Sequence, residues 1–114
     1  MTSDELLSYC LAMPGAWPDE PWADDVVVKV GTKIFAFLGD KTSAGLKCAA
    51  SREAADEWLA RYPEDAAVMP YIGRFGWNSL RISGGIPDDE LTEAIDASYA
   101  AILAKLPRKD RPGE

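Results

Sequence analysis

Basic and aromatic side chains are the residues of this 114-residue chain whose types and spacing best fit a binding chemistry. They recur in segments that we expect to be β-strands, and the set that we select is Lys29, Lys33, Lys47, Arg74, Trp77 and Arg81. Cationic groups neutralise phosphates and aromatic rings stack on bases, so a surface that combines the two could bind nucleic acid. The first candidate site is therefore a DNA-binding surface.

Groups that usually carry catalysis are scarce. The chain has no histidine, which removes the commonest general base and a frequent metal ligand. Cys10 and Cys48 lack metal-ligand spacing, so we expect two small buried residues in a reducing cytoplasm, with a disulfide between them as the alternative. Ser79 and Ser98 have no histidine to activate them. The sequence thus predicts a protein that is not an enzyme and holds no cofactor or metal.

Local signals place three helices around five strands. The expected helices cover residues 2–13, with a capping box from Thr2 to Glu5, residues 51–61, with Ser51 as N-cap, and residues 87–106. The expected strands cover residues 26–30, 33–38, 44–48, 68–72 and 77–82. This order predicts an α+β two-layer sandwich, α-β(3)-α-β(2)-α, whose antiparallel sheet has its helices on one face.

The remaining segments are expected to be loops or turns. Residues 16–25 contain two prolines and four acidic residues, which favours a loop that lays Trp17 and Trp22 across an edge of the core. An alternative is that one of these tryptophans contacts a partner. Residues 1–106 form a single domain in this interpretation, and residues 107–114 form a polar C-terminal tail that frays.

Alternation along the strands divides their side chains between two faces. If the more aliphatic face of each strand meets the helices, one set of basic and aromatic residues lies on the other face: Lys29, Lys33, Phe35, Phe37, Lys47, Trp77 and Arg81. The charge distribution agrees with this division. Residues 26–47 and 66–86 carry six basic residues and one acidic residue, whereas the remainder carries six basic and eighteen acidic residues, within a net charge of −7. The sheet is therefore expected to be basic and the helices and loops acidic.

Two structural alternatives account for the same residues. Phe35, Phe37 and Trp77 could fill a second small core under a loop, such as the one with Trp17 and Trp22. They could also be buried by a homodimer or another protein partner, because large exposed apolar patches usually mark interaction sites. A bulge in any strand would exchange the two faces, since side chains alternate with a period of two.

The order of several motifs resembles the MmcQ/YjbR-like family. The resemblance rests on Gly31-x-Lys33-Ile34-Phe35, Pro70-Tyr71, Trp77 with its alternating strand, the run from Gly85 to Leu91, and Ser98-Tyr99 before Leu106-Pro107-Arg108-Lys109. It spans nearly the whole chain, and it implies a small cytoplasmic protein with a two-layer α/β sandwich. It also implies DNA binding through two turns, at Gly31 and at Arg74–Gly76, which would carry Lys29, Lys33, Arg74 and Arg81.

Together, these patterns lead to one function and one alternative. The first is a non-enzymatic DNA-binding protein that uses the basic aromatic sheet face. The alternative is a protein-interaction module or homodimer that uses the same face. No stretch approaches the roughly 18 consecutive apolar residues of a membrane span, and the start of the chain lacks the pattern of a secretory signal, so we expect no membrane partner.

Overall fold

The computed structural model describes residues 1–22, 25–39 and 41–112. Its helices are α1 (Ser3–Leu11), α2 (Arg52–Arg61) and α3 (Asp88–Leu103), with two short 3-10 helices, η1 (Gly73–Phe75) and η2 (Arg108–Asp110). Its strands are β1 (Ala16–Trp22), β2 (Asp25–Val30), β3 (Lys33–Phe37), β4 (Ser43–Lys47), β5 (Ala66–Val68) and β6 (Trp77–Arg81). The strands form one antiparallel sheet in the order β1-β2-β3-β4-β6-β5.

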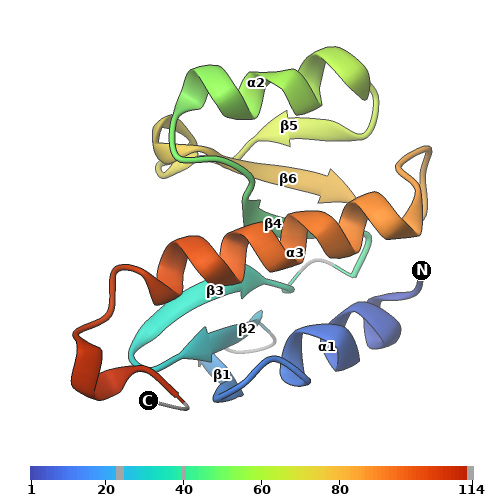
Figure 1. The fold of residues 1–114 in the computed structure, drawn as a ribbon. Coiled ribbons are helices and arrows are strands. Elements are labelled where there is room, and N and C mark those ends of the chain that lie inside the picture. The colour runs from blue at the N-terminus through green and yellow to red at the C-terminus, as the bar shows by residue number, and fades with distance from the viewer. Residues whose placement is uncertain (23–24, 40, 113–114) are drawn as a thin grey trace.

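The three helices cover one face of this sheet, as the α+β two-layer sandwich requires. Figure 1 shows α3 running across the middle of the sheet, with α1 beside β1 and β2 and α2 beside β5. Buried apolar residues from both layers form one core, including Leu6 and Cys10 of α1 and Leu91, Ile95 and Ile102 of α3. The predicted fold class is therefore confirmed.

Local capping explains where the first two helices begin. Thr2 and Glu5 form the predicted capping box at α1, in which each side chain accepts a hydrogen bond from the other residue's backbone N–H. The Ser51 hydroxyl accepts the N–H of Ala54 at the start of α2, as predicted. These two caps fix the helix starts that the sequence placed at the same residues.

The segment that was expected to be a loop contains a strand. Residues 16–22 form β1, an edge strand paired with β2, so the first group has four strands rather than three; residues 23 and 24 lie outside the described residues. Prolines are tolerated at an edge because one side of the strand needs no ladder hydrogen bond. The expected cover for the tryptophans was also wrong, since Trp22 is 59% exposed and Trp17 is 41% exposed.

A register shift in β3 changes the predicted division of faces. Val28 lies opposite Ala36 but Lys29 lies opposite Ile34, which leaves Phe35 without a partner in β2. Phe35 is fully buried and packs edge-to-face on Tyr99 of α3, with ring centroids 5.3 Å apart. Lys33 lies opposite Val30, a core residue, and so falls on the helix side of the sheet. The placement of Phe35 and Lys33 on the other face was therefore wrong.

The pairing between β3 and β4 is the shortest in the sheet. These strands pair at two positions, Ala36 with Leu46 and Phe37 with Gly45. Beyond them, the buried Ser98 hydroxyl of α3 donates to the Phe35 carbonyl at 2.6 Å and accepts the Lys47 N–H at 3.0 Å. A single helix side chain thus bridges the two strands where their own ladder has ended.

Two segments near the strand ends also differ from expectation. The strand expected over residues 68–72 is β5, which ends at Val68, and the chain from Met69 to Gly76 forms a connection that contains η1. Within the predicted polar tail, residues 108–110 form η2 and Arg111 donates to the Leu106 and Ala104 carbonyls. Residues 113 and 114 of the predicted tail lie outside the described residues.

Both cysteines are free thiols in this structure. Burial raises the pKa of Cys10 to about 12 and that of Cys48 to about 11, so both are protonated at neutral pH. Among the described residues, no helix combines the length and apolar character needed to cross a membrane. The same residues include no group of three or more cysteine, aspartate or glutamate side chains placed to hold a metal ion.

Candidate functional site

The face of the sheet opposite the helices is the candidate site, and we call it the helix-free face. Cross-strand pairing places four of the six predicted site residues there: Lys29, Lys47, Trp77 and Arg81. Arg74 lies beside the face, in the connection between β5 and β6, and Lys33 lies on the helix side. The structure therefore brings together part of the predicted basic aromatic cluster.

The two turns implied by the family resemblance lie at the same end of the sheet (Figure 1). The first is the β2–β3 hairpin turn, where Gly31 has a φ of 60°. The second ends at Gly76, whose φ of 92° lies in the left-handed region that favours glycine. A Cβ at Gly76 would also overlap the Ala49 carbonyl oxygen, so this turn requires glycine on two grounds.

Most of the cations on the helix-free face already have partners. Lys29 forms an ion pair with Asp19 at 2.8 Å, and this hydrogen bond lowers the pKa of the Asp19 carboxyl. Lys47 is only 4% exposed, and its ammonium donates to the Phe75 carbonyl. Burial, followed by the charge of Lys105, lowers the pKa of Lys47. These groups therefore offer little free positive charge to a phosphate.

The aromatic residues of the predicted cluster are largely enclosed. Trp77 is 7% exposed, and its ring packs edge-to-face on Phe37 with centroids 5.4 Å apart. Met69 covers the neighbouring strand, because a Cβ at Gly45 would lie 2.6 Å from its sulfur. Trp77 belongs to the same core as the helix-facing residues, with Phe37 packed against that core, so the separate second core considered as an alternative does not form.

The same connection carries the most exposed apolar surface near the face. Tyr71 is 97% exposed, and it is the one non-glycine residue among those described that has a positive φ, at 67°. Val68 and Phe75 are each about half exposed. An apolar hollow of about 290 Å³ lies against this segment, lined by Phe37, Met69, Pro70, Tyr71 and Ile72. We call these five residues and Phe75 the apolar rim.

Arg52 of α2 holds the connection in place. Its guanidinium donates to the carbonyls of Gly73 at 2.8 Å and Trp77 at 3.2 Å, and to Asn78 Oδ1 at 2.5 Å. Asn78 in turn donates to the Ala55 carbonyl of α2. Arg52 also forms an i,i+4 ion pair with Asp56 at 2.7 Å. Arg52 and Asn78 were not among the predicted residues, because the partners that connect them to the β5–β6 connection and to each other lie more than 20 residues away in the chain, and no local pattern indicates such contacts.

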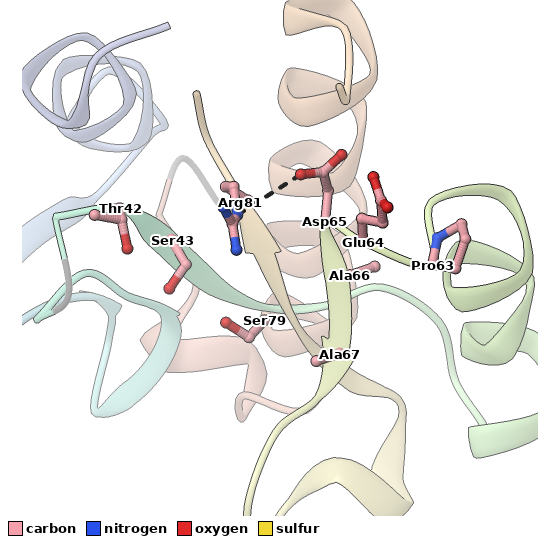
Figure 2. Close-up of a pocket in the computed structure, with 9 residues that line it drawn as sticks. All are labelled: Thr42, Ser43, Pro63, Glu64, Asp65, Ala66, Ala67, Ser79 and Arg81. Atoms are coloured by element: carbon pink, nitrogen blue, oxygen red, sulfur yellow. Dashed lines mark ion pairs between the residues drawn. The ribbon is translucent and has the colours of Figure 1, made fainter. Parts of the chain in front are cut away.

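A polar pocket lies at the other side of the helix-free face, around Arg81 (Figure 2). Its volume is about 250 Å³, and its lining includes Ser43 of β4, Ser79 of β6 and Asp65 before β5. The pocket exists because the side chains on its floor are small: Ser79 lies between Gly45 and Ala67 in neighbouring strands. Of its residues, only Arg81 belonged to the predicted set.

The fold and this face define the class: a two-layer α+β domain whose antiparallel sheet keeps one face free of helices. The family model described as YjbR matches residues 11–101, which is most of the chain. The chain therefore belongs to the YjbR family.

Individual relatives agree with this membership. The chain is 29% identical to the uncharacterized protein YjbR of Escherichia coli strain K12, over 97% of this chain and 95% of that protein. The crystal structure of Deinococcus radiodurans protein DR2400, of the DUF419 domain, has a TM-score of 0.82, at 23% identity over 96% of this chain and 84% of that one. A Pseudomonas syringae protein has a TM-score of 0.68, at 16% identity over 89% and 98% of the two chains. These two structures support the fold.

Proposed function

We propose that this protein is a non-enzymatic protein-interaction module that docks its partner on the apolar rim. The carrying observation is Tyr71, whose ring is 97% exposed while its backbone has a φ of 67°. A left-handed conformation costs a non-glycine residue about 1–2 kcal/mol. An aromatic residue that is strained and makes no compensating core contact fits a role in binding.

The chemistry of the rim supports this choice. Arg74 stacks over the Phe75 ring at 4.8 Å, so the connection presents a tyrosine, an arginine and a phenylalanine within five residues. Tyrosine and arginine are enriched among the residues that dominate binding energy at protein interfaces. A partner could therefore gain both apolar burial and a charged contact. A cytoplasmic location and the absence of a cofactor belong to the same proposal.

The test is photo-crosslinking from position 71 in cells. With p-benzoylphenylalanine at Tyr71, we expect one or a few defined crosslinked products, whereas the same group at exposed Ala100 on α3 should give none above background. Tyr71→Ala should weaken capture of the crosslinked partner by about 30-fold, the effect of losing a major interface anchor. A product between two copies of this chain would identify the partner as a second protomer.

Equal crosslinking at positions 71 and 100, or none at either, would contradict the docking role of the rim. The thermal unfolding midpoint of Tyr71→Ala provides the folding control. Because the ring is exposed, that midpoint should stay close to the unsubstituted value.

DNA binding is the second candidate function, and one observation favours it. Within the described residues, Lys33 and Arg74 are exposed and have no ion pair. Binding to duplex DNA through these two cations should weaken with salt at a log–log slope of about −2. Charge reversal of both Lys33 and Arg74 should abolish DNA binding. Charge reversal of Lys29, which already pairs with Asp19, serves as the matched comparison. Absence of any binding at low ionic strength would eliminate this candidate.

A further inference from the structure

The pocket around Arg81 is lined by one cation, Arg81, and by two carboxylates, Asp65 and Glu64. The hydrogen-bonding capacity of Arg81 and of Asp65 Oδ1 is largely unused. Arg81 Nε lies 3.6 Å from Asp65 Oδ1, which is an ion-pair distance but too long for a hydrogen bond. Among the described residues, the other guanidinium nitrogens of Arg81 have no hydrogen-bond partner, and its side chain is 60% exposed. Figure 2 shows the Asp65 carboxylate turned toward Arg81 across the pocket.

Asp65 is held in place by its other oxygen. Asp65 Oδ2 accepts the backbone N–H of Gly85 at 2.9 Å, and the side chain is 16% exposed. One carboxylate oxygen is thus anchored, while Oδ1 lies toward Arg81 and beside Gly84. Asp65 also precedes β5 directly, and its carbonyl accepts the Arg81 N–H at 2.7 Å, so the two charged residues are fixed relative to each other by the sheet.

The rest of the lining sets the size and polarity of the ligand. Ser43 lies opposite Arg81 in the adjacent strand, and Ser79 lies two residues before Arg81 on the same face. Their hydroxyls can donate hydrogen bonds to an anionic group next to the guanidinium. Ala66, Ala67 and Pro63 provide a small apolar side. A volume of about 250 Å³ is below the usual range for drug-sized ligands, so the ligand must be small.

We propose that this pocket binds a free α-amino acid with a small neutral side chain. Its carboxylate would bind the terminal nitrogens of Arg81 and the two serine hydroxyls, and its ammonium would bind Asp65 Oδ1. A phosphate or a dicarboxylate fits less well, because Asp65 and Glu64 would repel its second negative charge. A simple amine fits less well because it would leave the terminal nitrogens of Arg81 without an acceptor. A ligand with both charges binds the guanidinium and a carboxylate of the pocket at once.

The test is a titration of the full ¹⁵N-labelled chain, followed by ¹H–¹⁵N spectra. The probes are glycine, L-alanine, L-serine, L-threonine and L-valine. At least one should give saturable shifts at the Ser43, Ser79 and Arg81 amides, with a dissociation constant in the micromolar to millimolar range expected of so few atoms. The N-acetyl and carboxamide derivatives of that amino acid each lose one charge, so each should bind about tenfold more weakly or worse.

Substitutions within the pocket provide the second arm. Arg81→Met and Asp65→Asn should each weaken binding at least about tenfold, and Ser79→Leu should block it by filling the floor. Arg108→Met removes an exposed arginine outside the pocket lining and should leave the affinity unchanged. Circular dichroism melts identify any variant that has lost its fold. The affinities of the variants that remain folded then test the proposal.

Three outcomes would overturn the proposal. They are the absence of saturable shifts at amino-acid concentrations on the order of 10 mM, equal binding of a singly charged derivative, and equal shifts with inorganic phosphate. None of them bears on docking at the apolar rim, because the crosslinking test at position 71 uses neither this pocket nor its ligand.

Discussion

Replacing Ser98 with alanine is expected to lower the free energy of unfolding by about 2–4 kcal/mol. The hydroxyl is fully buried, and it satisfies the Phe35 carbonyl and the Lys47 N–H at once. Alanine would leave both backbone groups without these partners, and each unsatisfied buried group costs about 1–3 kcal/mol. The thermal midpoint should fall by about 10–20 °C, and urea unfolding followed by circular dichroism measures the loss.

The matched control is Ser8→Ala on α1. Ser8 is exposed, so the same chemical change there should alter stability by less than about 0.5 kcal/mol. If Ser98→Ala were as mild as this control, the bridge between β3 and β4 would contribute nothing measurable. Alanine is the better helix former at both positions, so the control also measures the propensity gain that partly offsets the loss at Ser98.

Replacing Arg52 with methionine is expected to cost about 2–4 kcal/mol of unfolding free energy. The substitution removes the donor for two backbone carbonyls and for Asn78 Oδ1, and charged hydrogen bonds of this kind contribute about 1.5–3 kcal/mol each. Arg52 is partly exposed, so water can replace some of the loss. The connection that carries Tyr71 should loosen, and limited proteolysis between residues 69 and 76 should accelerate under native conditions.

Arg61→Met on the same helix provides the comparison. Arg61 is more exposed and pairs with Glu90 on the surface, so its loss should cost less than about 1 kcal/mol. Arg52→Lys should fall between the two, since an ammonium keeps the charge but lacks the planar fork that reaches three acceptors. Unchanged proteolysis of the connection in Arg52→Met would contradict the anchoring role, even if global stability fell.

The parts of the fold that follow from local chemistry were predictable from the sequence. The capping box at Thr2 and Glu5 and the N-cap at Ser51 depend on neighbouring residues, and both lie where they were expected. The buried stripe of α3, with Leu91, Ile95 and Ser98, follows from helical periodicity. These signals were sufficient for the fold class.

The errors arose where tertiary pairing overrides the local pattern. β1 contains Pro18 and Pro21, and only its position at the sheet edge makes a strand possible there. The extra residue at Phe35 moves the side chains before it in β3 to the opposite faces of the sheet, and no local sequence motif indicates this bulge.

The candidate site was harder to predict than the fold, for the same reason: its residues are brought together by tertiary contacts. Lysine and arginine positions indicated a basic face, but the partner of Lys29 comes from the neighbouring strand β1 and the partner of Lys47 from the β5–β6 connection. The strain at Tyr71 is a backbone property, and the Arg81 pocket depends on which small side chains become neighbours across three strands. Neither feature has a signature in the sequence alone.

The narrow β3–β4 pairing has a consequence for how the molecule holds together. Residues 3–37 contain α1 with β1, β2 and β3, and residues 43–81 contain β4, α2, β5 and β6, so each half of the sheet is continuous in sequence. The halves meet at two paired positions, and α3 packs on β2, β3 and β4 across them. The two halves of the sheet are therefore joined by this short pairing, by the shared core and by the last helix. Partial opening should begin along this seam, with each half retaining its own strands.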